Sequence, residues 1–252
     1  MSFKIVAHRG ESQAAPENTV ESFAVALARG VTAIEGDFQT TSDGVVVCAH
    51  DTADLRRTAR CGRAISTMTL AEVKRLDVGL WRGSEWRYSR IPTLDEVLDL
   101  LPRRGELYLE LKSRGSILEA IAKSIVDHRL MPEQVTFIAF DEITVTAAKS
   151  LFPNHRAYWL TDLTSCGHRL NPEELVDKLT MLGADGADID ADCLLSGEYI
   201  EALHRHNLEC HVWTVDDSYR AAELFEWGVD SVTSNRASAL INELNHRFGE
   251  KK

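Results

Sequence analysis

The 252-residue sequence predicts an α/β protein folded as a (β/α)8 (TIM) barrel. Short apolar strands alternate with helical segments along the chain, and such alternation is typical of a parallel sheet. Eight strand–helix units can be counted, and a barrel of eight units is commonly about 250 residues long. The alternative is an open doubly wound sheet, but no Gly-x-Gly-x-x-Gly motif follows any strand to indicate a dinucleotide site.

The eight units follow one another in order. The first is the strand FKIVAH (3–8) with a helix over 18–30 that a glycine ends. The second strand is AIEGDF (33–38), and its helix begins at Thr93, where a glutamate three residues later completes a capping box. The other six strands are LYLELK (107–112), VTFIAF (135–140), RAYWL (156–160), GADID (186–190), ECHVWTV (209–215) and SVTS (231–234), and their helices cover about 116–129, 142–150, 172–182, 197–206, 218–227 and 237–247.

We expect residues 1–252 to form a single domain, because no shift in composition and no low-complexity tract divides the chain. Hydrophobic residues make up 44% of the sequence, which is enough for a sizeable core. Residues 52–91, between the second strand and its helix, lack clean periodicity. We therefore expect them to form a short insertion or small lid after the hairpin of the second strand.

The charge of the chain restricts its partners. There are 39 acidic and 28 basic residues, a formal net charge of −11. Such a surface repels nucleic acid and anionic membranes on average, so we expect neither a nucleic-acid partner nor a stable membrane association. An anionic small-molecule substrate would have to be attracted by a few placed cations or by a metal ion. The sequence does not indicate an oligomeric state.

The cysteines and the first residues suggest a cytoplasmic location. The N-terminal MSFKIVAHRG is too short and too polar for a signal peptide, and no apolar run approaches the ~20 residues of a membrane span. The cysteines are odd in number, scattered and without a Cys-x-x-Cys pair, so we expect reduced thiols. They are Cys48, Cys61, Cys166, Cys193 and Cys210.

The stretch IEGDFQTTSDGVVVCAHD (34–51) predicts a β-hairpin with its turn at residues 42–44. Glu35 and Asp37 are two residues apart in a strand, so their side chains point to the same face. A turn at that position folds His50 back beside both carboxylates. The expected pairs, to within one residue, are 40 with 46, 38 with 48 and 36 with 50.

A third carboxylate, Glu110, ends the next barrel strand. In a barrel the C-terminal ends of the strands face the active-site mouth, so Glu110 should meet Glu35 and Asp37 there. The two hairpin carboxylates could instead lie on a solvent face, but their apolar flanks make this less favourable, because unpaired buried carboxylates are costly. Three carboxylates from neighbouring strands suit one hard divalent cation, Mg2+ or Ca2+.

Basic and imidazole side chains surround this predicted metal site. Lys112 shares a face with Glu110 and either forms a salt bridge with it or binds an anionic substrate. Arg9, at the end of the first strand, offers the bidentate donors that match a phosphate group. His8 and His50 would lie on either side of the carboxylates, an arrangement that suits an acid–base pair.

Together these residues form a pattern that resembles the glycerophosphodiester phosphodiesterase family of phospholipase-C-like TIM barrels, in its compact bacterial cytosolic type. The matching elements occur in the family's order and span most of the chain. They are AHRG (7–10), PENT (16–19), IEGD (34–37), TSDGVVVCAHD (41–51), IPTLDEVL (91–98), LELK (109–112) and VWTVD (212–216).

The resemblance implies a metal-dependent hydrolase that cleaves glycerophosphodiesters to sn-glycerol 3-phosphate and an alcohol. It implies that Glu35, Asp37 and Glu110 bind the divalent metal and that His8 and His50 serve as general base and acid. Which histidine has which role stays open, as do the native metal, the preferred head group and the nucleophile, which is water or a glycerol hydroxyl.

The resemblance also assigns the remaining residues of the site. Arg9 and Lys112 would contact the phosphate, and Trp213 would wall the glycerol pocket, although it could equally be a core tryptophan. The residues implied to orient the site are Glu17 and Asn18 in the first loop and Asp51 beside His50. Asn18 could also cap the following helix.

Three departures from the family pattern concern substrate selection more than the reaction. The last strand reads TSNRAS where Thr-Asp-x-Pro is common, AFD (139–141) replaces Ser-Phe-Asp, and Gly36 stands where larger apolar residues are usual. Two alternatives remain: a related lyase acting on phosphoinositides or sphingolipid head groups, and a barrel that binds a phosphate ligand without catalysis. A membrane-acting lyase should show exposed apolar loops or a secretion signal. A non-catalytic barrel should have lost one of the acidic or histidine residues of the site.

Overall fold

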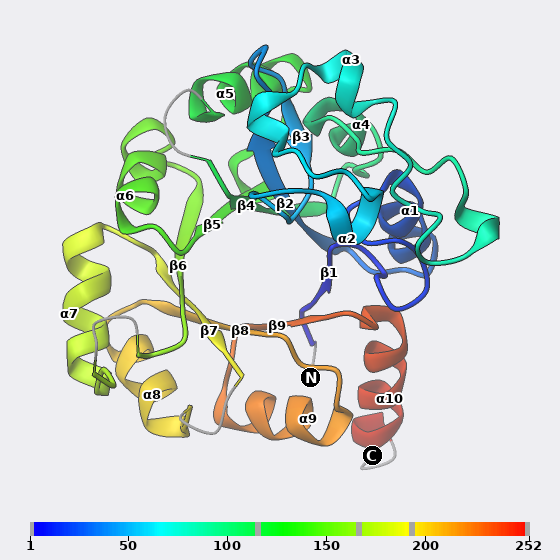
Figure 1. The fold of residues 1–252 in the computed structure, drawn as a ribbon. Helices are drawn as coiled ribbons and strands as arrows, with labels where there is room; N and C mark the ends of the chain where they lie inside the picture. The colour runs from blue at the N-terminus through cyan, green and yellow to red at the C-terminus, as the bar shows by residue number, and fades with distance from the viewer. Residues whose placement is uncertain (1–2, 114–116, 165–167, 192–194, 250–252) are drawn as a thin grey trace.

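The structure, a computed structural model, describes residues 3–113, 117–164, 168–191 and 195–249. Within these ranges, eight parallel strands close into a barrel with helices around its outside, as Figure 1 shows. The barrel closes because β1 pairs with β2 on one side and β9 on the other. The strands are β1 (Ile5–His8), β2 (Ala33–Thr40), β4 (Glu106–Leu111), β5 (Val135–Ala139), β6 (Arg156–Thr161), β7 (Gly186–Asp190), β8 (Glu209–Trp213) and β9 (Ser231–Ser234).

This topology confirms the predicted (β/α)8 barrel and excludes the open sheet. The additional strand β3 (Val46–Cys48) runs antiparallel to β2 and forms the predicted hairpin. The helices outside the barrel are α1 (Val20–Ala28), α4 (Leu94–Leu98), α5 (Ile117–Asp127), α6 (Glu142–Leu151), α7 (Pro172–Leu182), α8 (Gly197–Arg205), α9 (Ser218–Trp227) and α10 (Ala237–Gly249), with the 3-10 turn η3 (Pro132–Gln134) before β5.

Most boundaries agree with the predicted ones to within two residues, and the differences have local causes. The first helix begins at Val20 instead of residue 18, because Thr19 is its N-cap and accepts a hydrogen bond from the Ser22 amide. Asn18 therefore does not cap the helix; its backbone has a left-handed φ of 56° and its side chain turns toward the barrel. The capping box predicted at Thr93 is confirmed, since Glu96 closes it.

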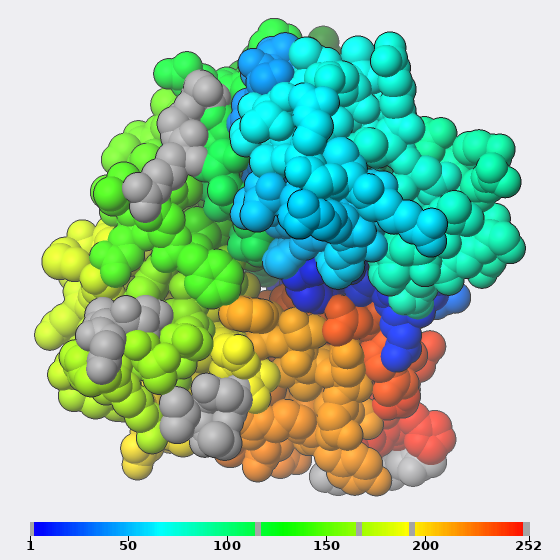
Figure 2. Space-filling view, viewed as in Figure 1, coloured from blue at the N-terminus to red at the C-terminus, as the bar shows by residue number. Residues whose placement is uncertain are grey.

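The insertion at residues 52–91 is ordered around a small apolar cluster of its own. Leu55, Ile65 and Ile91 are fully buried in it and pack with Val47 of β3. Figure 2 shows the insertion, in cyan and teal, covering part of the face seen there. Its short helical segments are α2 (Arg56–Ala59), η1 (Ile65–Thr67), α3 (Leu70–Val73) and η2 (Ser84–Trp86).

The barrel interior is apolar in the middle and charged at the N-terminal ends of the strands. Val6, Ile138 and Leu160 belong to the apolar layer. Below it, charged side chains contact tyrosines and a histidine, and we call this group the lower cluster. Its members are Lys4, Glu106, Tyr108, Arg156, Tyr158, Glu209 and His211.

Among the described residues, no helix is both long and apolar enough to cross a membrane. Of the cysteines, Cys48, Cys61 and Cys210 are free thiols. Cys166 and Cys193 lie outside the described residues.

Candidate active site

Three carboxylates from two adjacent strands meet at the barrel mouth. Glu35 and Asp37 lie on β2 and Glu110 on β4, and the parallel register places Asp37 beside Glu110. One oxygen of each carboxylate lies within 4.8 Å of the others. The three carboxylates expected at the C-terminal ends of the strands therefore lie together. We call these three residues, with Arg9 and Lys112, the mouth cluster.

The hairpin has the register expected from the sequence. Phe38 lies opposite Cys48, and Thr40 lies opposite Val46. The pairing of 36 with 50 is not part of the ladder, but the chain after β3 places His50 in the same cavity as Glu35.

Gly36 fits this hairpin for a steric reason. A Cβ there would lie 3.0 Å from Cys48 Sγ and 3.1 Å from a Phe23 ring carbon. The space that a larger residue would occupy is thus filled by the neighbours of Gly36.

Asp37 is the most heavily paired carboxylate of the mouth cluster. Its side chain lies 3.1 Å from both Arg9 Nε and Lys112 Nζ. Asn18 donates to its Oδ2 at 2.7 Å and accepts from its backbone amide at 3.1 Å. Burial alone would raise the pKa of Asp37, but Arg9 and Lys112 outweigh it and hold the pKa below its usual range.

Glu35 and Glu110 are less well compensated. Glu35 accepts the Arg9 amide at 2.9 Å, while its other oxygen is buried without a hydrogen-bond partner. Glu110 contacts Lys112 at 2.5 Å. Burial, and then the negative charge of Asp37, raises the pKa of both groups, that of Glu110 to about 8. A cluster of hard oxygen ligands with an uncompensated oxygen is the environment that a divalent cation such as Mg2+ or Ca2+ fits.

The backbone around Arg9 aims it at the carboxylates. Arg9 has a left-handed φ of 55°, and Gly10 follows with a φ of 80°. A Cβ at Gly10 would lie 2.4 Å from Ser22 Oγ, so only glycine allows this close turn against α1. The guanidinium reaches Glu17 at 2.9 Å as well as Asp37.

His8 is held by a residue that sequence reasoning did not identify. Its Nδ1 lies 2.8 Å from Asn235 Oδ1, while Asn235 Nδ2 donates to Asp216 at 2.8 Å. The amide oxygen therefore accepts the Nδ1 proton, and His8 Nε2 faces Glu35 at 4.0 Å. Burial, and then Arg9, lowers the pKa of His8. Asn235 lies in the segment TSNRAS and Asp216 in VWTVD. Sequence reasoning noted both segments but assigned no role to these two residues.

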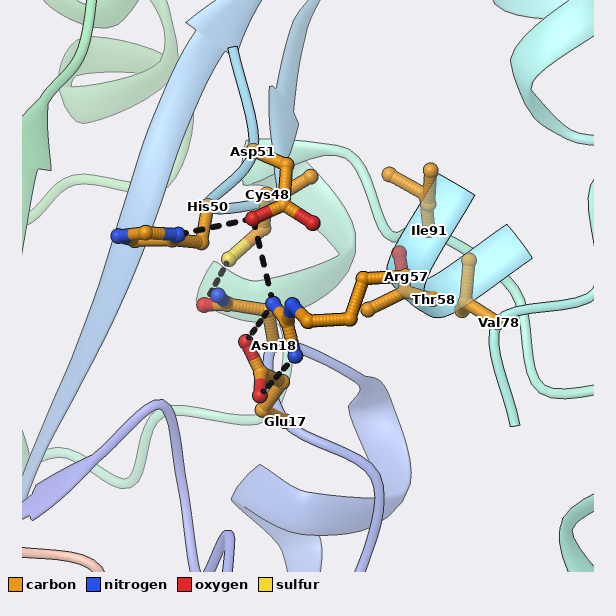
Figure 3. Close-up of a pocket in the computed structure, with 10 residues that line it drawn as sticks. Glu17, Asn18, Cys48, His50, Asp51, Arg57, Thr58, Val78 and Ile91 are labelled. Carbon is orange, nitrogen blue, oxygen red and sulfur yellow. Dashed lines mark hydrogen bonds and ion pairs between the residues drawn. The ribbon is translucent and has the colours of Figure 1, made fainter. Parts of the chain in front are cut away.

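His50 is paired with a carboxylate. Its Nδ1 lies 3.0 Å from Asp51 Oδ1. Arg57 of the insertion bridges Asp51 and Glu17, donating to Glu17 at 2.8 and 2.9 Å, as Figure 3 shows. Sequence reasoning missed Arg57, because the segment around it has no periodicity to indicate where its side chains point.

A cavity joins these groups at the barrel mouth. One side carries His8, Arg9, Glu35, His50, Glu110 and Lys112. The other side carries Ile138, Phe140, Leu160, Asp188, Trp213 and Thr233. Trp213 thus lines the cavity as expected, with the Phe140 ring at right angles to it and 5.6 Å away. Every predicted metal, acid–base and phosphate residue, apart from the buried Asp37, lines this cavity.

Comparisons with known proteins agree with this geometry. Residues 8–239 match the model of the glycerophosphoryl diester phosphodiesterase family. A glycerophosphodiester phosphodiesterase of Bacillus subtilis is 30% identical over 246 residues, which cover 91% of this chain and 82% of that protein. One of Caldanaerobacter subterraneus is 29% identical over 96% of this chain and 98% of its own length. A phosphodiesterase of Oleispira antarctica, solved with the product sn-glycerol-3-phosphate, superposes with a TM-score of 0.86 at 26% identity over 96% of each chain.

Proposed function

The chain belongs to the glycerophosphoryl diester phosphodiesterase family, and we propose that it hydrolyses glycerophosphodiesters to sn-glycerol 3-phosphate and an alcohol with one bound divalent cation. The observation that carries this proposal is the convergence of two imidazoles, two basic side chains and two of three clustered carboxylates on one cavity. The named activity of the Bacillus subtilis and Caldanaerobacter relatives supports the substrate class.

Glu35, Asp37 and Glu110 would hold the cation, Mg2+ or Ca2+, through carboxylate oxygens. Such a cation neutralises charge on the phosphoryl oxygens of a bound diester. Arg9 and Lys112 reach into the same cavity and would bind those oxygens directly, Arg9 through its planar fork of donors. The Arg9 and Lys112 side chains both contact Asp37, so the buried negative charge of Asp37 fixes their positions.

His8 and His50 act as the acid–base pair in this proposal, and their neighbours favour His8 as the base. The Asn235 oxygen accepts the Nδ1 proton of His8, which leaves Nε2 free to accept a proton from the nucleophile. The Asp51 carboxylate lies 3.0 Å from His50 Nδ1 and fixes the orientation of the ring, and this leaves His50 as the group that donates a proton to the leaving alcohol.

Glu17, Asn18 and Asp51 position these groups instead of contacting the substrate. Glu17 holds Arg9, and Asn18 holds Asp37 from the other side. Arg57 ties Glu17 to Asp51, so the first loop and the His50 loop are braced against each other.

We also propose that the chain works as a single-domain enzyme in the cytoplasm, on a small-molecule substrate and without nucleic-acid or stable membrane partners. The free thiols of Cys48, Cys61 and Cys210 and the net charge of −11 support this setting.

The test is a coupled assay for glycerol 3-phosphate release from choline, ethanolamine, glycerol and inositol glycerophosphodiesters. Purified protein is assayed after EDTA treatment and after adding back Mg2+ or Ca2+. We expect turnover only with added metal. Activity that persists in excess EDTA would contradict the metal dependence.

Two other outcomes separate the alternatives. Release of a cyclic phosphate as the final product would favour a lyase. Saturable binding of glycerophosphocholine without turnover, measured calorimetrically in saturating metal, would favour a non-catalytic barrel.

A further inference from the structure

One buried carboxyl group in the cavity has no role in the chemistry described above. Asp188, the third residue of β7, points into the barrel and is only 1% exposed. Its Oδ1 has no hydrogen-bond partner, and no ion pair to it is found among the described residues. Burial alone raises its pKa to about 8.

Among the described residues, the other buried acid outside the mouth cluster is Glu11, and it is paired. The carboxylate of Glu11 receives the amide and the hydroxyl of Ser238. A buried carboxyl without a hydrogen-bond partner destabilises the fold, because its desolvation is not offset by any hydrogen bond. The fold leaves Asp188 in this state where it lines a cavity, so its partner is expected to come from the occupant of that cavity.

The two ends of the cavity differ in shape and chemistry. The end that carries Asp188 is formed by interior strand residues, with Ile138, Leu160 and Thr233 beside it and Trp213 as a wall. The other end opens past His50 and Lys112 into a wide surface hollow lined by Thr52, Ala53 and Arg56. Arg9, Lys112 and two of the carboxylates, which would bind the phosphoryl group and the cation, line the same cavity.

Glycerophosphodiesters have one constant and one variable half. Every such substrate contains the same glycerol unit, whereas the alcohol on the other side of the phosphorus differs in size and charge. A closed subsite of fixed shape suits the constant half, and an open one suits the variable half.

We propose that Asp188 determines specificity for the glycerol unit by accepting a hydrogen bond from one of its free hydroxyls. The carbon backbone of glycerol then lies against Trp213 and Leu160, while its hydroxyl donates to the unpartnered Oδ1 of Asp188. This inference rests on the proposed function, since it assumes that the phosphoryl group is bound at the mouth cluster.

The test compares Asp188→Leu and Asp188→Asn with the wild type on two diesters. Glycerophosphoglycerol carries glycerol, whereas bis(p-nitrophenyl) phosphate has a phosphodiester but no glycerol. For Asp188→Leu we expect kcat/KM on glycerophosphoglycerol to fall about 10- to 100-fold, since a hydroxyl buried without its acceptor loses about that much binding. Turnover of bis(p-nitrophenyl) phosphate should stay at the wild-type level, and Asp188→Asn, which keeps an acceptor, should recover part of the loss.

Asp177→Leu is the matched control, because it removes the same charge from the exposed side of the neighbouring helix α7. We expect wild-type kinetics from it on both substrates. Equal losses on both diesters in Asp188→Leu, or no loss on either, would overturn the proposal.

A binding measurement keeps this test separate from the proposed function. Calorimetric titration with sn-glycerol 3-phosphate and with inorganic phosphate, both in Mg2+, reads the subsite without turnover. Weaker binding of glycerol 3-phosphate to Asp188→Leu, with phosphate binding unchanged, supports the proposal even if no diester is hydrolysed. Unchanged binding of both ligands counts against it whether or not the enzyme is active.

Discussion

Two charged clusters lie inside the same barrel, at opposite ends, and they differ in how completely their charges are paired. In the lower cluster, Glu209 accepts hydrogen bonds from Arg156, Tyr158 and His211. In the mouth cluster, an oxygen of Glu35 is buried without a hydrogen-bond partner. The pKa values follow: that of Glu209 is lowered to about 2, where the hydrogen bonds outweigh burial, and burial raises that of Glu110 to about 8.

Buried charge by itself therefore does not mark a functional site. Compensated charge stabilises the closed end of the barrel, whereas uncompensated charge is stable only when a ligand or ion completes it. Substitutions at the mouth should therefore affect activity more than stability, and substitutions at the lower end should do the reverse.

The largest effect should come from removing one negative charge of the mouth cluster. We expect Glu35→Gln to lower kcat/KM by ~10⁴-fold, because a divalent cation contributes several kcal/mol to the transition state. Calorimetry should show weakened Mg2+ binding, while the melting temperature of the metal-free protein stays the same or rises, since the substitution removes one of three clustered like charges. Glu106→Gln, the matched change at the lower end, should keep its activity. Equal losses of kcat/KM in both variants would show that the two clusters do not differ in function.

The next effect concerns the histidines. His8→Ala and His50→Ala should each reduce turnover by ~10²–10⁴-fold, the usual contribution of a general acid or base, with the fold intact by circular dichroism. His206→Ala, on the exposed end of α8, serves as the control. Wild-type activity in both His8→Ala and His50→Ala would refute their assignment.

At the lower end the effect should be on stability. Glu209→Ala removes the acceptor of Tyr158 and His211, whose side chains lie inside the barrel. We expect the free energy of unfolding, measured with urea, to drop by about 2–3 kcal/mol, since hydrogen bonds to charged groups are of that size. The kcat of the folded variant should be unchanged, and a loss of kcat at full occupancy of the folded state would show that the two ends are coupled.

The residues that could be predicted from the sequence are those whose placement depends on local geometry. Strand parity puts Glu35 and Asp37 on one face, a short turn returns His50, and the parallel register of adjacent strands adds Glu110. None of these steps needs the closed barrel. The strand and helix order was predictable for the same reason, since each apolar pattern is local.

The positions of the residues that were missed depend on the closure of the barrel or on segments without regular periodicity. Asn235 meets His8 only because β9 pairs with β1, at a separation of 227 residues along the chain. Arg57 lies in an aperiodic segment whose fold is set by its own apolar cluster. Asp188 stood within a predicted strand, but parity does not reveal whether an inward side chain finds a partner.

The smallest predicted effect is a pH dependence of the lower cluster. The groups that face Glu209 are Arg156, Tyr158 and His211, and they lower its pKa from 4.5 to about 2 against the opposing effect of burial. A carboxylate with a depressed folded-state pKa contributes its stability in full above the unfolded pKa and loses it as the pH falls through the folded pKa. The wild type should therefore exceed Glu209→Gln in unfolding free energy by about 1–2 kcal/mol at pH 6, after allowance for solvent screening of the partly exposed Arg156.

This stability difference should shrink between pH 4.5 and about 2, and urea titrations of both proteins across that range would measure it. Burial lowers the pKa of His211 and Glu209 opposes that effect, so part of the difference between the two proteins comes from His211. A difference that stays constant down to pH 2 would mean that Glu209 is stabilised by packing and not by its charge. The lower cluster would then stabilise the barrel by packing, as the apolar layer above it does. Charge pairing would no longer explain why the lower cluster and the mouth cluster differ.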